Sequence, residues 1–140
     1  MNHDEQFPPV LKAMPGKKQL VLRMIPMPPD MNLHENVIFG GWIMSQIDLA
    51  GFVMARTVTK NRDFVTVAVN PMLFKNPIKV GDVVSFYAEI KKIGRTSITI
   101  DVTVYAWQDD FEVAPTLVSE ATITYVAVDK NQKPRPIVSE

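Results

Sequence analysis

The sequence has no cysteine, only two histidines and no excess of either charge, and these shortages exclude several classes of protein. Without cysteine there is no disulfide scaffold, no thiolate metal site and no cysteine nucleophile. Two histidines are too few for most histidine-built metal centres, and we predict no metal. Lys and Arg number 15, as do Asp and Glu, so the 140-residue chain has zero formal net charge. A basic nucleic-acid-binding protein is therefore not expected.

The chain also lacks a long hydrophobic run and a signal peptide. Its most apolar stretch, residues 40–55, contains Ser45, Gln46 and Asp48 and is short for a membrane span. The polar, proline-rich start has no apolar segment of the length that a signal peptide needs. We therefore expect a cytoplasmic protein with no membrane partner. We predict one domain over residues 18–136, between a flexible segment 1–17 and a tail 137–140.

Apolar periodicity predicts one long helix and five strands. Residues 42–58 contain no proline and are apolar nearly all round, which predicts a central helix buried on most sides. A first strand is expected at 19–27, and four strands follow the helix, with a bulge or strand end near Pro71 and Pro77. Mostly short turns join these four strands, which favours antiparallel pairing. The sequence thus predicts an α+β fold, with a five-stranded antiparallel sheet wrapped around one long central helix.

The most informative residue is Asp48, a carboxylate about two turns into this apolar helix. Burial of an ionised carboxylate costs several kcal/mol unless hydrogen bonds compensate, so leucine would fill a core position better. One interpretation places Asp48 on a polar surface stripe beside Ser45 and Gln46. The other places it in a pocket, where it performs acid–base or nucleophilic work, and Ser45, on the same helix face, would hydrogen-bond its carboxylate.

Gly40 and Gly41 are expected to open the helix. The first N–H groups of a helix have no internal partner and lie at the positive end of its dipole, and glycine lets a ligand approach them closely. A polarised carbonyl oxygen would bind well there. The alternative is a tight turn that needs positive φ at these glycines.

Two loops carry further polar candidates. Asn32 and His34 lie in the loop before the helix; Asn32 would orient a carbonyl or a water, or serve only as a turn residue. His34 is a possible general base, although a solvent-exposed histidine is the commoner role. Gly94, Arg95, Thr96 and Ser97 form a predicted hairpin, whose side chains would hold a phosphate or an amide, or serve only the turn.

The run FGGWIMSQIDLAG at residues 39–51 resembles the helix of hot dog-fold acyl-CoA thioesterases, closest to the YciA type. Further segments agree in order: MPPD at 27–30, VTV at 65–67, VGD at 80–82, GRTS at 94–97 and VAVD at 126–129. The resemblance extends from about residue 20 to residue 136. In the related proteins the loop before the glycine pair usually contains a glycine, whereas here it reads NLHEN at 32–36, one residue longer.

The resemblance implies hydrolysis of acyl-CoA to a free acid and coenzyme A, with no cofactor besides the coenzyme A of the substrate. It implies a homodimer whose sheets join edge to edge and whose active sites are shared, commonly assembled as a trimer of dimers, that is, a hexamer. Asp48 matches the catalytic acid, acting as general base or nucleophile. Asn32 matches a residue that the partner subunit supplies, and Gly41 matches the helix start that polarises the thioester. The remaining matches, expected to bind substrate, are Gly40, Ser45, Thr66, Arg95, Thr96 and Ser97.

Besides a structural or interaction protein whose apolar helix is only core, against which Asp48 argues, two alternatives remain open from the residues. A hydratase or dehydratase of acyl thioesters would need a histidine facing the substrate, and only His34 is available outside the polar N-terminal start. A non-catalytic acyl-CoA sensor is the other alternative. Sensors of this kind usually carry a DNA-binding domain, for which we expect no room in this chain.

Overall fold

The computed structural model describes residues 16–33, 37–59, 63–108 and 112–137. Strand β1 (Gln19–Met24) and a short 3-10 helix (Pro28–Asp30) precede the long helix α2 (Gly40–Thr59). Four strands follow it: β2 (Phe64–Phe74), β3 (Val83–Ile93), β4 (Ser97–Trp107) and β5 (Thr116–Ala127). The predicted order of one strand, one helix and four strands is confirmed.

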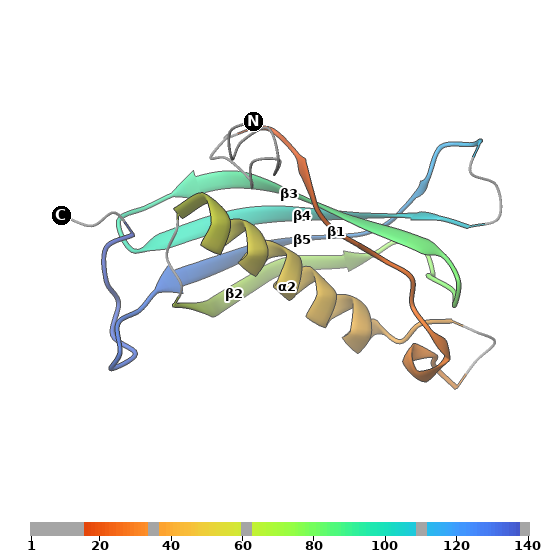
Figure 1. Ribbon diagram of the computed structural model, residues 1–140, viewed down its shortest axis with the longest axis horizontal. Coiled ribbons are helices and arrows are strands. Elements are labelled where there is room, and N and C mark those ends of the chain that lie inside the picture. Colours follow the sequence, from red (N-terminus) through yellow and green to blue (C-terminus); the bar gives the residue numbers. More distant parts are fainter. Residues whose placement is uncertain (1–15, 34–36, 60–62, 109–111, 138–140) are drawn as a thin grey trace, which may run out of the picture.

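The five strands form one sheet in the order β1-β3-β4-β5-β2, and every neighbouring pair is antiparallel. Helix α2 lies along one face of this sheet (Figure 1). Because α2 spans that face, the chain enters β2 at the edge beside β5, and β2 does not pair with β3, which follows it in sequence. One edge of β2 therefore has no strand partner among the described residues.

Strict alternation along the central strands builds the core between sheet and helix. On β4, the buried residues Ile98, Ile100, Val102 and Val104 point to the helix side, and polar residues fill the positions between them. The helix contributes a row of buried residues to the same core, namely Trp42, Ile43, Ile47, Ala50, Gly51, Met54 and Ala55. These side chains bury the apolar surface that stabilises the domain.

The prediction of a helix buried on most sides is wrong for the single chain. Met44 and Leu49 are 48 % and 47 % exposed, because one sheet covers only one side of α2. Strand β2 beside it is also open, and Val67 and Phe74 are 55 % and 52 % exposed there. The outer side of α2 and strand β2 thus both carry exposed apolar side chains in the single chain.

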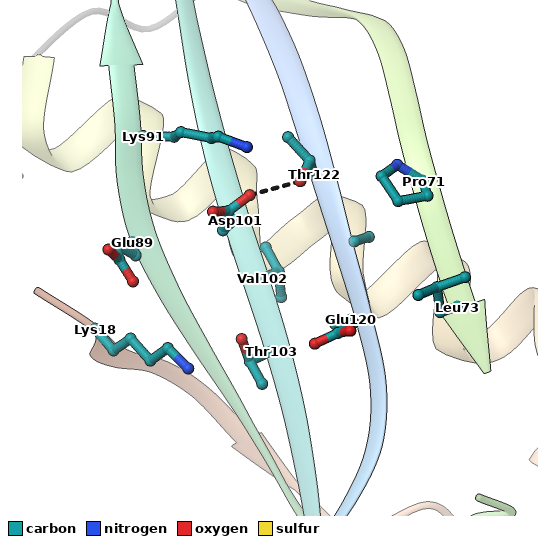
Figure 2. Close-up of a pocket in the computed structure, with 11 residues that line it drawn as sticks. Lys18, Pro71, Leu73, Glu89, Lys91, Asp101, Val102, Thr103, Glu120 and Thr122 are labelled. Carbon is teal, nitrogen blue, oxygen red and sulfur yellow. Dashed lines mark hydrogen bonds between the residues drawn. The ribbon is translucent and has the colours of Figure 1, made fainter. Parts of the chain in front are cut away.

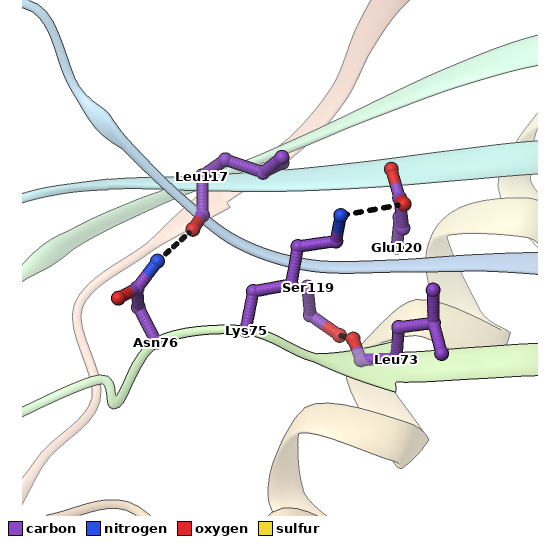
Figure 3. Close-up of polar contacts among 6 residues, drawn as sticks. All are labelled: Leu73, Lys75, Asn76, Leu117, Ser119 and Glu120. Carbon is purple, nitrogen blue, oxygen red and sulfur yellow. Dashed lines mark hydrogen bonds and ion pairs between the residues drawn. The ribbon is translucent and has the colours of Figure 1, made fainter.

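The bulge expected near Pro71 is confirmed, since the pairing of β2 with β5 skips between Val69 and Met72. Beyond it, side-chain bonds hold the end of β2 against β5 (Figure 3). Ser119 Oγ donates to the Leu73 carbonyl at 2.6 Å, and Asn76 Nδ2 donates to the Leu117 carbonyl at 2.7 Å. Lys75 Nζ lies 3.2 Å from Glu120 Oε1. The irregular strand therefore keeps a defined position at the sheet edge.

The chain ends require one revision. Ile137, where the sequence suggested a tail, is 6 % exposed, belongs to the core cluster and donates its N–H to the Arg95 carbonyl. The folded part thus extends at least to this residue. Of the predicted flexible segment 1–17, only residues 16 and 17 lie within the described ranges.

Candidate functional site

Asp48 lies in the middle of α2, half-buried where the helix crosses β5 and β2. Its carboxylate oxygen Oδ1 accepts a hydrogen bond from Thr66 Oγ1 at 2.9 Å. The Tyr125 hydroxyl lies 3.1 Å from the same Oδ1 and 2.6 Å from the Asp48 backbone carbonyl oxygen. Asp48 is therefore not a residue of a free polar stripe, because two hydroxyl groups of the sheet engage it.

The sheet register explains why these two hydroxyls meet at one carboxylate. Thr66 on β2 and Tyr125 on β5 are directly paired residues of the antiparallel ladder. Their side chains therefore project from the same face of the sheet, the face that carries α2. No hydrogen bond or ion pair to the second carboxylate oxygen, Oδ2, comes from the described residues. The site thus presents a carboxylate with one oxygen held and one oxygen available for a water or an acyl carbon.

Tyr125 is the residue that the sequence analysis missed. Its side chain is fully buried, and burial, followed by the nearby Asp48 carboxylate, raises the pKa of Tyr125 above its usual value. The phenol therefore stays protonated and remains a hydrogen-bond donor. Two signals were present in the sequence: a tyrosine among the small and aliphatic inward residues of β5, and Gly51 within α2, one turn after Asp48.

The predicted hydrogen bond from Ser45 to Asp48 is wrong. Ser45 Oγ donates back to its own helix, to the carbonyls of Gly41 at 3.1 Å and Trp42 at 3.0 Å. A serine within a helix commonly bonds a carbonyl three or four residues earlier, and this local partner prevails here. Thr66, expected only to bind substrate, takes the place at the carboxylate instead.

Gly40 and Gly41 open α2 as predicted, and both are solvent-exposed. Neither has positive φ, so the tight-turn alternative is wrong. The next N–H group of the helix, that of Trp42, donates to the Phe39 carbonyl at 3.1 Å. The N–H groups of Gly40 and Gly41, in contrast, donate to no backbone carbonyl of the described residues outside the helix. A groove of about 300 Å³ opens beside Gly40 and is lined by Ile38, Gly40, Ile43, Phe74, Lys75, Asn76, Pro77 and Ile78.

The helix start and Asp48 are too far apart in one chain to act on the same carbonyl. Gly41 and Asp48 share a helix face, but they are seven residues apart, or about 10 Å along the axis at 1.5 Å per residue. A carbonyl oxygen bound to the Gly41 N–H would lie farther still, because N–H groups point toward the start of the helix. A single chain thus contains both parts without bringing them together.

Asn32 also lies away from Asp48. It is exposed in the loop before α2, where its Oδ1 accepts the Leu33 N–H at 2.7 Å. This is local turn bonding, and no hydrogen bond joins Asn32 to Asp48. His34 lies outside the described residues.

The Gly94–Ser97 segment forms the predicted β3–β4 hairpin, at the end of the molecule where α2 finishes (Figure 1). The carbonyls of Arg95 and Thr96 accept the N–H groups of Ile137 and Ala127, so the hairpin is anchored through its backbone. The Arg95 side chain is exposed. Neither Arg95, Thr96 nor Ser97 reaches Asp48 by a hydrogen bond, so the structure leaves the substrate role of this hairpin as a prediction.

A second hollow, of about 290 Å³, lies on the sheet face opposite α2 (Figure 2). Its lining is of mixed charge and includes Lys18, Glu89, Lys91, Asp101 and Glu120. The helix lies behind the sheet in this view, so the hollow is separated from Asp48 by the strands.

Among the described residues, no group of three or more His, Asp or Glu side chains is placed to hold a metal ion. No helix of the described part is long and apolar enough to cross a membrane.

Many known proteins are similar to this chain, and three illustrate the likeness. The acyl-CoA thioester hydrolase YciA of Salmonella typhimurium is 44 % identical over 123 residues, which cover 85 % of this chain and 90 % of that protein. The structure of HI0827, a hexameric broad specificity acyl-coenzyme A thioesterase solved as an aspartate-to-alanine variant, superposes with a TM-score of 0.80 at 43 % identity and covers 89 % of each chain. A hexameric hotdog fold thioesterase of Campylobacter jejuni gives a TM-score of 0.75 at 39 % identity, covering 85 % of this chain and 90 % of that one.

The family model that matches this chain is the thioesterase superfamily, over residues 35–112. That range includes the glycine pair, all of α2, Thr66 and most of the sheet. The same arrangement of helix and sheet is found in the superposed thioesterases, which confirms the hot dog fold. This chain therefore belongs to the thioesterase superfamily, among the relatives of the YciA acyl-CoA thioester hydrolases.

Proposed function

We propose that this protein is an acyl-CoA thioesterase, which converts an acyl-CoA and water into a free acid and coenzyme A. The observation that carries the proposal is the Asp48 carboxylate, with Oδ1 bonded to Thr66 and Oδ2 available. A fixed carboxylate at the edge of a buried core is the group that such a hydrolysis needs. The likeness to YciA and to HI0827 supports the substrate class.

The reaction balances with Asp48 in either of two roles. As general base, Asp48 removes a proton from water, the hydroxide oxygen bonds to the acyl carbon, and the carbon–sulfur bond breaks to release the thiolate, which takes up a proton. As nucleophile, an Asp48 oxygen bonds to the acyl carbon while the carbon–sulfur bond breaks, and the released thiolate takes up a proton. Water then hydrolyses the mixed anhydride, which gives the free acid and restores the Asp48 carboxylate. Thioesters are activated acyl donors, so no serine–histidine pair is required. Coenzyme A leaves as product, and the proposal includes no further cofactor.

We further propose that the active site is shared between two copies of the chain. Asp48 of one subunit would act with Asn32 and Gly41 of the partner, because in the same chain Gly41 lies about 10 Å away along the helix and Asn32 lies in the loop before it. The open edge of β2 and the exposed Val67 and Leu49 offer an apolar surface next to the site. The hexameric state of the solved relatives supports a trimer of such dimers.

The direct test measures release of coenzyme A thiol with a thiol-reactive dye, which gives no protein background because the chain has no cysteine. Acetyl, butyryl, hexanoyl, octanoyl, lauroyl and palmitoyl-CoA would be compared for wild type and Asp48→Asn. Asparagine keeps the shape and the Oδ1 acceptor but cannot serve as base or nucleophile. We expect wild-type turnover on at least one chain length and a loss of at least about 100-fold in Asp48→Asn. An Asp48→Asn enzyme with half of the wild-type turnover would refute the assignment.

The shared site is tested by mixing two inactive variants. Asp48→Ala and Asn32→Ala would each be inactive alone, and subunits exchanged at equal amounts form mixed dimers that contain one intact site. About a quarter of the wild-type activity would then return. If Asp48 and Asn32 act within the same subunit, no mixed dimer contains an intact site and no activity returns.

Of the two alternatives, the hydratase would depend on His34 and the sensor would not turn substrate over. His34→Ala separates the first, because a thioesterase that uses Asp48 should retain most of its activity. Tight coenzyme A binding without turnover on any acyl chain would favour the sensor.

The Arg95, Thr96 and Ser97 hairpin remains our proposal for contacts with the phosphates or amides of coenzyme A. The cytoplasmic location also remains a proposal, based on the balanced, cysteine-free composition.

A further inference from the structure

Tyr125 occupies a position that the reaction, as outlined so far, does not use. Its side chain is fully buried on β5, yet its hydroxyl lies 2.6 Å from the Asp48 carbonyl oxygen and 3.1 Å from Asp48 Oδ1. A buried hydroxyl needs a partner, but a main-chain carbonyl alone would satisfy it. The single phenolic proton is shared between the two acceptors, and the longer bond, to the carboxylate oxygen, connects the core of the sheet to the reacting side chain.

Gly51 makes this approach possible. A Cβ atom at position 51 would lie 2.4 Å from the Tyr125 hydroxyl oxygen and 3.0 Å from ring atom Cε2, closer than atoms pack. Glycine inside a helix costs about 1 kcal/mol relative to alanine, so helix stability alone disfavours it. The missing side chain is therefore explained by the tyrosine that fills its place. Phe52 packs edge-on against the Tyr125 ring, with centroids 6.2 Å apart, and restricts its movement.

Thr66 and Tyr125 together restrict the Asp48 carboxylate. They are paired across β2 and β5, so the sheet fixes the spacing between their hydroxyls. Both contact Oδ1, which opposes rotation of the carboxylate about its χ2 angle and leaves Oδ2 on the other side. The raised pKa of Tyr125, caused first by burial, keeps its hydroxyl protonated, and therefore a donor, at neutral pH.

We propose that Tyr125, admitted by Gly51, is a positioning residue that holds Asp48 Oδ1 with Thr66, so that Oδ2 is the oxygen that reacts. Tyr125 is enclosed in the core and acts through Asp48, without contact to substrate. The proposal rests on the proposed thioesterase function. Its chemical basis is preorganisation: a carboxylate held in its reactive orientation loses less freedom on reaching the transition state.

The test compares steady-state kinetics of Tyr125→Phe, Gly51→Ala and the double variant with wild type. Tyr125→Phe keeps the ring and removes only the hydroxyl. We expect kcat to fall about 10-fold or more with KM within about twofold, since substrate contacts are unchanged. Gly51→Ala should lower kcat as well, because its methyl group displaces the hydroxyl. The same methyl group should also lower the stability of Gly51→Ala, because it overlaps the Tyr125 hydroxyl oxygen. The double variant lacks that oxygen, so its stability should recover while its kcat stays low.

Tyr105→Phe is the matched control, because Tyr105 packs against Tyr87 from the neighbouring strand and lies outside the core cluster that contains Tyr125. It loses the same group and should keep wild-type kcat. Wild-type kcat in Tyr125→Phe would overturn the inference, and so would recovery of kcat in the double variant, since packing alone would then explain the effect. Asp48→Asn, assayed in parallel, separates the two proposals: if it is active, the thioesterase mechanism itself fails.

Discussion

At the scale of single residues, one oxygen atom of Asp48 receives hydroxyl contacts from two strands, and this decides what the carboxylate can do. A carboxylate on an open helix face would rotate freely and be hydrated on both oxygens. Here Thr66 and Tyr125 engage Oδ1, and Ser45, which the helix pattern favoured as partner, bonds its own helix instead. The reactivity of Asp48 is therefore a property of its neighbours in the sheet as much as of the helix that carries it.

Thr66 provides the first prediction at this scale. Thr66→Val preserves the shape of the side chain but removes the hydroxyl that donates to Asp48 Oδ1. A hydrogen bond to a charged group contributes about 1.5–3 kcal/mol, so we expect kcat to fall by about 10-fold or more. Thr66→Ser, which keeps the hydroxyl, is the control and should retain most of the turnover measured by thiol release. Equal kcat values for the valine and serine variants would contradict the assigned role.

Tyr125 provides the second prediction, through the pH dependence of stability. Its pKa is raised in the folded protein, so above about pH 10 the unfolded chain loses a phenolic proton that the folded chain keeps. The free energy of unfolding then decreases as the pH rises, by about 1.4 kcal/mol at pH 11 from this group. Tyr125→Phe has no phenolic proton at this position, so its free energy of unfolding lacks this pH-dependent decrease. Urea unfolding at about pH 8 and pH 11 should therefore show a smaller difference between wild type and variant at the higher pH. A constant difference would count against the raised pKa.

At the scale of elements, glycine is required at two positions for two different physical reasons. Gly51 has ordinary helical φ, and its lack of a side chain serves Tyr125 packing from β5. Gly81 lies in the turn before β3 at φ +92°, and apart from its two chain neighbours no described residue has a heavy atom within 4 Å of where its Cβ would be. One glycine is required by a neighbour, and the other by the backbone conformation of its turn.

Gly81→Ala tests this distinction. The space is open, so the cost comes only from placing a side chain at positive φ, about 1–2 kcal/mol. We expect the free energy of unfolding in urea to fall by that amount while kcat and KM stay at wild-type values, since the turn does not contact Asp48. Unchanged stability would show that the turn adopts another conformation, and a loss of kcat would connect this turn to the site.

At the scale of the whole molecule, the single chain leaves an apolar surface open beside its catalytic candidate. The sheet covers one side of α2 only, and β2 is an edge strand with apolar residues exposed on it. A monomer with such an edge is prone to pair with another strand, and a second copy that pairs there would cover α2 and bring its own Asn32 and Gly41 toward Asp48. Assembly and catalysis are thus expected to be lost together.

Val67→Lys tests this coupling. Val67 is 55 % exposed in the single chain, so lysine there costs the folded subunit little, but in a dimer it would place two like charges in an apolar contact. We expect a smaller species in analytical ultracentrifugation and a loss of thioesterase activity. Val113→Lys is the matched control, because Val113 is 58 % exposed in the β4–β5 connection, away from β2. This variant should keep the wild-type size in ultracentrifugation and the wild-type activity. A fully active Val67→Lys enzyme of wild-type size would exclude β2 from the interface.

The helix, the strands and the importance of Asp48 could all be predicted from local sequence patterns. Periodicity and the absence of proline predicted α2 and the strands, because these depend on neighbours within a few residues. Asp48 was identified as exceptional because an ionised group in an apolar helix requires a reason. The glycine pair at the helix start was predicted from backbone chemistry alone, and the family from a continuous motif.

The surroundings of Asp48, in contrast, depend on contacts between residues that are far apart in the sequence. Thr66 and Tyr125 are 18 and 77 residues away in sequence, and they meet the carboxylate because β2 enters the sheet beside β5 after α2 has crossed it. Local patterns contain no information on that strand order, and for this reason they favoured Ser45, the nearest hydroxyl on the helix. The same holds for the exposed side of α2: apolarity all round the helix predicts burial, but only the fold shows that one sheet covers a single side, because a sheet packs against one helix face at a time.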